Sequence, residues 1–157
     1  RRVSATIALE SVRQPGIADL LALSDAYAAE RYPPEGNFAF SIDELDVPEI
    51  SFAVARQDGR ALGCGGLKFE ADGSAELKRL FVHDEARGQG LGRRLITYLE
   101  DLARHRGVAI INLETGPLNT EAVKLYSSQG YVECGPFGPY ALNPWSLFMT
   151  KSIGPTG

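Results

Sequence analysis

The sequence predicts a single-domain α/β protein over residues 1–157, in which a mixed, mostly antiparallel twisted sheet is flanked by helices. Strand-like runs separated by Asp-Gly dipeptides predict a meander of hairpins, because these dipeptides suit the positive φ angles of tight turns. An amphipathic helical segment followed by a strongly apolar run then has the order of a βαβ crossover. A length of 157 residues is that of one ordinary domain.

The N-terminal part begins with an expected strand at 4–12, where apolar and polar residues alternate until Pro15-Gly16. Apolar residues at helical spacing predict a helix from Ile17 to about Arg31, which the prolines at 33 and 34 end. A short helical piece is expected at 41–45.

The remaining elements follow from the same two periodicities and from glycines placed as helix ends. The expected strands are 50–55, 61–69, 75–82, 108–113, 131–134 and 147–150. The expected helices are 91–102, with its end at Gly107, and 119–129, closed by Gly130.

Composition excludes several classes of protein. Sixteen basic and twenty acidic residues give a net charge of −4, the wrong sign for a protein that binds nucleic acid through its phosphates. No apolar stretch approaches the roughly 20 residues of a membrane-crossing helix, and a secretory apolar region is missing, so a cytoplasmic protein without membrane contact is expected. Cys64 and Cys134 lack metal-site spacing and are expected to be buried thiols, and His83 and His105 lack a helical partner, so no metal is expected.

The most informative segment is the glycine-rich run from Arg87 to Arg94, which stands between a strand and an amphipathic helix. Glycines allow tight bends and close approach of a ligand, and a helix start offers free N–H groups at the positive end of its dipole. The segment is therefore expected to bind an anion. It matches neither the P-loop, which needs Lys before Ser or Thr, nor the dinucleotide fingerprint G-x-G-x-x-G. A simple structural turn is the alternative.

Arg87, Gly90 and Gly92 match the pattern [QR]-x-x-G-x-[GA], and on this segment the chain resembles the acyl-CoA-binding motif of the GNAT superfamily of N-acetyltransferases. The resemblance implies that acetyl-CoA is the cosubstrate and that backbone amides of the loop hold its pyrophosphate. It also implies that the end of the preceding strand pairs with the pantetheine arm. The cofactor-binding residues expected on this basis are Leu80, Phe81, Val82, Arg87, Gly88, Gln89, Gly90, Leu91, Gly92 and Arg93.

A second block resembles the family's later motif N-x-x-A-x-x-x-Y-x-x-x-G-[FY], matched by Asn119, Ala122, Tyr126, Gly130 and Tyr131. Asn119 is expected either to contact the cofactor or to cap the helix, because its side-chain oxygen suits a free N–H. The resemblance implies that Tyr126 lies near the coenzyme sulfur and protonates the departing thiolate. The alternative is a packed aromatic side chain whose hydroxyl has an incidental partner.

An amine acceptor must lose a proton before it attacks, since an ammonium with a pKa near ~10.4 is almost entirely charged at pH 7. Glu76 lies on the strand before the loop, in a register that resembles that of the glutamate base in some GNAT enzymes. Strand alternation places it on one face with Lys78, Leu80 and Val82, so an exposed ion pair with Lys78 is the alternative role. Glu114 or a carboxylate of the first helix is a further alternative for the base.

In the family the acceptor lies between the loop after the first helix and the last hairpin, here 32–40 and 136–145. The expected function is transfer of acetyl from acetyl-CoA to a primary amine of a small molecule, by direct attack with general-base and general-acid assistance. A peptide or protein acceptor, at a lysine or the N-terminus, and a catalytically silent acyl-CoA-binding module are the alternatives. A homodimer is compatible with the sequence.

Overall fold

A computed structural model describes residues 4–154, and within them a seven-stranded sheet has the order β1-β2-β3-β4-β5-β7-β6. Neighbouring strands are antiparallel except for β4 and β5, which pair in parallel. The predicted mixed, mostly antiparallel sheet is confirmed. The strands are β1 (Thr6–Leu9), β2 (Ile50–Gln57), β3 (Arg60–Phe69), β4 (Ala75–Val82), β5 (Ile110–Thr115), β6 (Val132–Cys134) and β7 (Leu147–Ser152).

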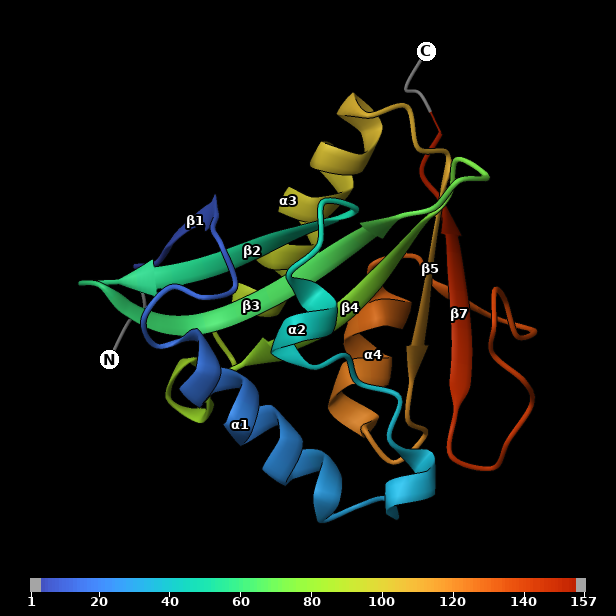
Figure 1. Cartoon of the computed structure of the whole chain (residues 1–157), viewed down its shortest axis with the longest axis horizontal. Helices are drawn as coiled ribbons and strands as arrows, with labels where there is room; N and C mark the ends of the chain where they lie inside the picture. The colour runs from blue at the N-terminus through green and yellow to red at the C-terminus, as the bar shows by residue number, and fades with distance from the viewer. Residues whose placement is uncertain (1–3, 155–157) are drawn as a thin grey trace.

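The helices cover both faces of the sheet, with α1 and α2 on the near side of the view in Figure 1 and α3 on the far side. One core lies between α1 and the sheet around Ile17, Val54 and Cys64. The other lies between α3 and the sheet around Leu67, Leu95 and other apolar residues. The helices are α1 (Ile17–Ala29), α2 (Ile42–Leu45), α3 (Leu91–His105) and α4 (Thr120–Ser128), with short 3-10 turns η1 (Pro34–Gly36) and η2 (Asp84–Ala86).

The hairpin turns lie where the Asp-Gly dipeptides predict them. Asp58 and Gly59 have φ angles of 53° and 78°, the pair of positive values that a tight two-residue turn needs. Strand β1 is shorter than the predicted 4–12, and β5 begins at Ile110 instead of 108. Helix α4 begins at Thr120, one residue after the expected start, so Asn119 occupies its N-cap position.

A β-bulge at Arg79 corrects the predicted faces of β4. Arg79 has a φ of 58°, and the pairing with β3 shifts between Cys64 and Gly66. The extra residue reverses the alternation beyond it. Leu80 and Val82 therefore pack on the α3 face, opposite the face expected from their spacing to Glu76.

Strands β4 and β5 separate after a short parallel contact. Their pairing runs only from Ala75 with Ile111 to Leu77 with Leu113. Beyond that point the two strands diverge in Figure 1, and α4 is visible in the opening between them. The divergence leaves the last part of β4 without a strand partner on the edge facing β5 among the described residues, and it opens a space between the two strands.

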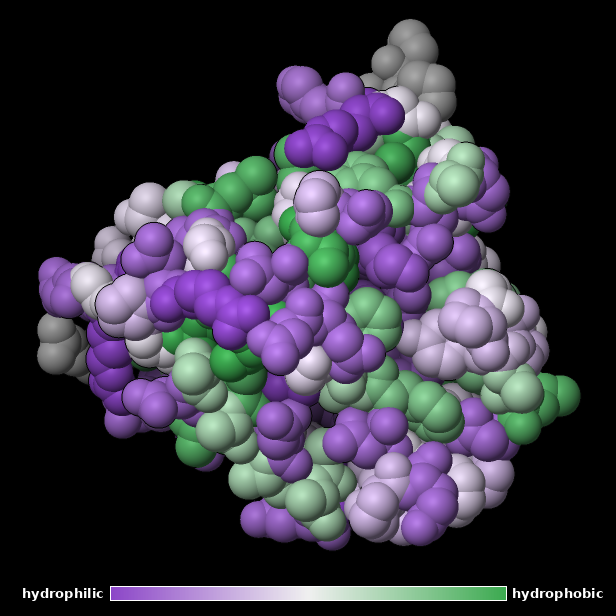
Figure 2. Space-filling view, viewed as in Figure 1, coloured by the Kyte–Doolittle hydropathy of each residue, from purple (hydrophilic) through white to green (hydrophobic). Residues whose placement is uncertain are grey.

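The face in Figure 2 shows hydrophilic and hydrophobic residues interspersed over α1, α2 and the neighbouring loops. None of the helices between residues 4 and 154 combines the length and apolar character that a membrane crossing requires.

Candidate active site

The glycine-rich loop ends in an uncapped helix. Gly90 is the N-cap of α3 with a φ of 79°, and as a glycine it offers no side-chain acceptor to the free N–H groups of the first turn. Gly88 also has a positive φ, of 77°, so both residues adopt a backbone conformation that a side chain disfavours. The first turn carries no acidic residue. Donor groups and the positive end of the helix dipole are therefore directed at the space before α3, as an anion site requires.

Gly92 has a packing role in addition. A Cβ atom at this position would lie 2.8 Å from Cδ2 of Leu125 on α4, so the absent side chain lets α3 and α4 approach closely. The loop and the second motif are thereby held against each other.

Arg87 is tied to the end of β4. Its Nε donates to the carbonyl oxygen of Val82 at 3.1 Å, and its guanidinium carbon lies 5.4 Å from the ring centre of Tyr27 and 5.5 Å from that of Phe81. Its Nη1 is 3.2 Å from Oδ1 of Asp84. The cation is thus fixed at the edge of the loop.

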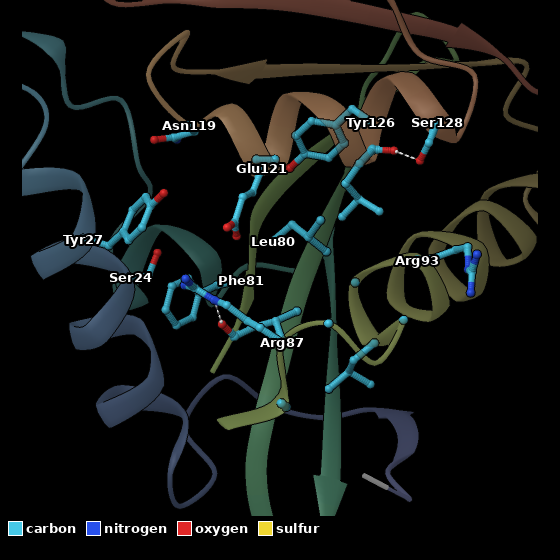
Figure 3. Close-up of a pocket in the computed structure, with 18 of the residues that line it drawn as sticks. Ser24, Tyr27, Leu80, Phe81, Arg87, Arg93, Asn119, Glu121, Tyr126 and Ser128 are labelled. Carbon is cyan, nitrogen blue, oxygen red and sulfur yellow. Dashed lines mark hydrogen bonds between the residues drawn. The ribbon is translucent and has the colours of Figure 1, made fainter. Parts of the chain in front are cut away.

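A cavity of about 490 Å³ joins these features. Figure 3 shows α1 on one side of it, α4 on the other and β4 between them. Of the predicted cofactor-binding residues, Gln89 does not line this cavity. The residues that do are Leu80, Phe81, Val82, Arg87, Gly88, Gly90, Leu91, Gly92, Arg93 and Asn119, together with Tyr126.

Asn119 does not cap α4 with its side chain. Its Oδ1 accepts instead from the hydroxyl of Tyr32, at 3.4 Å, and the same hydroxyl accepts from the backbone N–H of Leu118 at 2.8 Å. The expected capping bond is therefore wrong, and the side chain faces the cavity. Tyr32 follows α1 and is distant in sequence, so no local pattern could have revealed this contact.

A second cavity, of about 400 Å³, lies on the side of the sheet that carries α1. It is bordered by the loop 33–39, by Glu76 to Leu80 of β4, by 114–116 at the end of β5 and by Trp145. The loops expected to hold the acceptor thus both contribute to it. It shares Ser24, Ala28, Leu80, Asn119 and Tyr126 with the first cavity, so the two spaces meet at the divergence of β4 and β5.

Glu76 forms a buried polar cluster with Lys78 and Tyr140. Its Oε2 accepts from the Tyr140 hydroxyl at 2.6 Å and lies 3.1 Å from Nζ of Lys78, which is itself 2.7 Å from the hydroxyl. Nζ also lies 3.7 Å from the ring centre of Phe40. The ion pair anticipated for Glu76 is present but buried, with side chains only 7% and 5% exposed, not exposed as expected. Tyr140 was not a sequence candidate.

Glu114 lines the same cavity and has fewer hydrogen-bond partners than Glu76. It is the first residue of β5 beyond the pairing with β4. Its Oε2 accepts from Oγ of Ser146 at 2.7 Å. Burial raises the pKa of the Glu114 carboxyl, while the Ser146 hydrogen bond and the charge of Lys78 act to lower it.

Tyr126 lies between the cavities. Its ring packs edge-on against Tyr131, with ring centres 6.0 Å apart. Its hydroxyl makes no hydrogen bond within residues 4–154, and burial together with the charge of Glu114 raises the pKa of this hydroxyl. The phenol therefore stays protonated at neutral pH, the state that a proton donor needs.

No group of three or more His, Cys, Asp or Glu side chains suited to hold a metal occurs within the described part of the chain. Cys64 is buried and Cys134 half-buried, so the expectation of two buried thiols is met only by Cys64. His83 accepts at Nδ1 from the backbone N–H of Glu85 at 3.1 Å and caps η2.

The fold is that of acyl-CoA-dependent N-acyltransferases, and the matches to known proteins show that class for this chain. The family model of the acetyltransferase (GNAT) family matches residues 17–131, and the chain therefore belongs to this family. An IAA acetyltransferase of Azospirillum brasilense is 41% identical over 151 residues, which cover 96% of this chain and 99% of the relative.

Two solved structures illustrate the range of acceptors named for this fold. The ribosomal-protein-S18-alanine N-acetyltransferase from Escherichia coli has a TM-score of 0.69 at 25% identity, covering 98% of this chain and 97% of that one. An aminoglycoside 6'-acetyltransferase type Ii has a TM-score of 0.75 at 24% identity, covering 97% of this chain and 99% of that one. At this identity the likeness shows the fold alone.

Proposed function

We propose that this protein transfers the acetyl group of acetyl-CoA to a primary amine of a small molecule by direct attack. The observation that carries the proposal is the meeting of the two cavities at Leu80, Asn119 and Tyr126. A cofactor held along β4 and an acceptor held beyond it would come together at this junction, and placing two reactants in contact contributes a large part of such catalysis.

The residues of the first cavity fit acetyl-CoA. The uncapped start of α3 and the positive φ of Gly88 and Gly90 suit its pyrophosphate. On the edge that faces β5, the part of β4 beyond Leu77 pairs with no strand within residues 4–154, so its backbone groups there suit the amides of the pantetheine arm. When bound, acetyl-CoA supplies the activated thioester carbonyl.

Two side chains packed closely on backbone form part of the wall of the acceptor cavity, and they support a small acceptor. A Cβ atom at Gly36 would lie 2.7 Å from Cγ of Trp145, so the indole packs directly on the η1 backbone. Tyr32 packs equally tightly on the backbone of Gly116 and bonds the N–H of Leu118. These contacts join the loops on either side of the cavity and leave a space of drug-like size, about 400 Å³.

The proposed chemistry assigns proton removal to a carboxylate and proton donation to Tyr126. Glu76 is the base predicted from sequence, and Glu114 is the second carboxylate of the cavity. General-base assistance contributes about 10²–10⁴-fold, so loss of either carboxylate alone is expected to slow transfer without ending it.

The acceptor class is tested by following CoA release from acetyl-CoA with 2-phenylethylamine, tyramine, spermidine, free lysine and a hexapeptide with N-terminal alanine. We expect turnover with one or more of the free amines and little with the peptide. Preference for the peptide would overturn the small-molecule assignment, and CoA binding without acetylation of any of these compounds would favour a silent acyl-CoA-binding module.

The cofactor site is tested by calorimetry with CoA on Arg93→Glu. Arg93 is exposed in the first turn of α3, where a glutamate suits the helix dipole but repels the phosphates. We expect CoA affinity to fall by about 10-fold or more with the fold intact. Lys124→Glu makes the same charge change on α4 outside the cavity and is the matched control. Equal affinities in the two variants would place the phosphates elsewhere.

A further inference from the structure

The charged residues of the acceptor cavity leave one charge without a partner. Asp25 pairs with Arg79, with 2.7 Å between Oδ1 and Nη1, and Glu76 pairs with Lys78 at 3.1 Å. Glu114, the fifth charged residue of the lining, makes no salt bridge within residues 4–154. Glu114 is half-buried, and because a carboxylate partly removed from water is stabilised by a nearby cation, this position favours a positively charged group supplied from outside.

The surroundings of Glu114 are suited to hold such a cation. One oxygen accepts from Ser146, and the carboxylate has further acceptor capacity, since an ionised carboxylate offers about four lone-pair sites. Lys78 is fully engaged by Glu76, Tyr140 and the ring of Phe40, so its ammonium is not free to move to Glu114.

We infer that Glu114 binds the ammonium group of the acceptor and takes its proton, and that Glu76 acts by holding Lys78 and Tyr140 in place. The inference rests on the proposed function and adds a residue and a substrate property to it. The acceptor is then a compact amine that is cationic when it binds.

The step balances with groups of this chain. The Glu114 carboxylate takes one proton from the ammonium, and the freed lone pair forms the N–C bond with the acetyl carbon while the C–S bond breaks and leaves its electron pair on sulfur. Tyr126 gives its proton to that sulfur and regains one from the nitrogen. Glu114 then releases its proton to solvent, so the products are the N-acetyl amide, the CoA thiol and one proton.

The same carboxylate and phenol are electrostatically linked, because burial and, to a smaller extent, the charge of Glu114 raise the pKa of Tyr126. Titratable and polar groups interact with Glu114 from several elements around the cavity: burial, Ser146, Lys78 and Glu76 shift its pKa, and burial together with its own charge raises the pKa of three tyrosine hydroxyls. These groups are Glu76 and Lys78 on β4, Ser146 next to β7, Tyr32 after α1, Tyr126 on α4 and Tyr140 in the last loop.

The test compares Glu114→Gln, Glu76→Gln and Ser146→Ala, using the most active amine among the five compounds named above and measuring kcat/KM from pH 5 to 9. We expect Glu114→Gln to lower kcat/KM by about 100-fold or more, through both KM and kcat, and Glu76→Gln to lower it several-fold. Ser146→Ala removes a bond that stabilises the Glu114 carboxylate, so the acidic limb of the profile is expected to move to higher pH.

The inference would be overturned by a kcat/KM of Glu114→Gln within twofold of wild type, or by an acidic limb of the pH profile that does not move in Ser146→Ala. In either case acetylation by the wild type would still uphold the proposed function. A wild type that acetylates none of the five compounds while binding acetyl-CoA overturns the proposed function itself. Circular dichroism and CoA calorimetry of each variant separate loss of the carboxylate from loss of the fold.

Discussion

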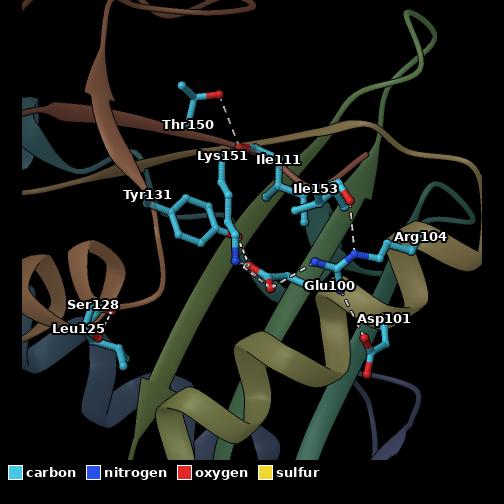
Figure 4. A network of polar contacts seen from close by, with 10 residues as sticks. All are labelled: Glu100, Asp101, Arg104, Ile111, Leu125, Ser128, Tyr131, Thr150, Lys151 and Ile153. Carbon is cyan, nitrogen blue, oxygen red and sulfur yellow. Dashed lines mark hydrogen bonds and ion pairs between the residues drawn. The ribbon is translucent and has the colours of Figure 1, made fainter. Parts of the chain in front are cut away.

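Within residues 4–154 two clusters share the same chemistry, a buried glutamate with a lysine and a tyrosine hydroxyl, and the cluster around Glu76 lines the acceptor cavity. Glu76 has Lys78 and Tyr140 as partners beside the acceptor. Glu100 on α3 accepts from Tyr131 at 3.0 Å and lies 3.0 Å from Nζ of Lys151. Figure 4 shows this second cluster, which also involves Arg104, between α3 and the last strands.

The Glu100 cluster connects elements that are far apart in sequence, because α3 is joined through it to β7 and to the residue before β6. Arg104 extends the connection by donating from Nε to the carbonyl of Ile153 at 3.1 Å. Its role is therefore structural. The likeness supports our proposal that the Glu76 cluster is also a fixed connection, between β4 and the loop that carries Tyr140. In that proposal Glu114, which makes no salt bridge within residues 4–154, is the reactive carboxylate.

Glu100→Gln tests the structural side of this comparison and has the largest expected effect on stability. It leaves Lys151 without its anion, and because that side chain is 21% exposed we expect a loss of about 2 kcal/mol of unfolding free energy, below the value for a fully buried pair. Urea denaturation measures it. Acetylation per folded molecule should change less than twofold, and a large rate defect would contradict a purely structural role.

Tyr126→Phe removes the proton donor while keeping the ring and its contact with Tyr131. We expect the single-turnover rate of acetyl transfer to fall by about 10-fold with CoA affinity unchanged. Stability should barely change, because the hydroxyl makes no hydrogen bond within the described residues. A rate equal to wild type from pH 6 to 9 would exclude Tyr126 as the acid.

Tyr140→Phe and Tyr131→Phe are a matched pair, since each removes the hydroxyl that one of the two glutamates accepts. Each is expected to cost about 1 kcal/mol of stability. Only Tyr140→Phe should also lower kcat/KM, by a few-fold, because only it loosens a wall of the acceptor cavity. Thermal melts measure the stability of both variants, and steady-state kinetics measure kcat/KM. Equal losses of kcat/KM in the two variants would contradict the view that only the Glu76 cluster affects the acceptor cavity.

Glu114→Gln has a small expected effect on stability, of opposite sign to that of Glu100→Gln. The pKa of Glu114 is raised from 4.5, mainly by burial, so the folded protein holds this proton more tightly than the unfolded chain. The stability that Glu114 contributes is fully present below the pKa that it has in the unfolded chain. It is lost as the pH rises through the pKa that it has in the folded protein. The variant should therefore be slightly more stable than wild type at pH 7, and the difference should shrink towards pH 4 in urea titrations. A less stable variant at pH 7 would indicate that Glu114 already has a cationic partner.

Much of the fold could be predicted because its signals are local. The Asp58-Gly59 turn and the glycine-rich start of α3 depend on φ angles that neighbouring residues do not alter. The order of strands and helices along the chain and the crossover followed from hydrophobic periodicity, whereas the insertion of β7 between β5 and β6 did not. The faces of Leu80 and Val82 could not be predicted, because the bulge at Arg79 reverses them and its sequence carries no signal for a positive φ.

The acceptor side depends on contacts between residues far apart in the chain. Tyr140 reaches Glu76 across 64 positions and Tyr32 reaches Leu118 across 86, distances over which spacing rules say nothing. The same holds for Asn119, whose capping bond was a sound local expectation but is replaced by a contact with Tyr32.

The sequence by itself determined the family, the order of strands and helices along the chain and the place of the glycine-rich loop before α3, because backbone conformation and a helix start are properties of short segments. Only the tertiary structure decided which carboxylate is paired and which is not. Glu76 and Glu114 are the same residue type, and their difference comes from their surroundings. Lys78 and Tyr140 bind the carboxylate of Glu76. Glu114 lies where β4 and β5 have diverged, so it lines the cavity without such partners among the described residues.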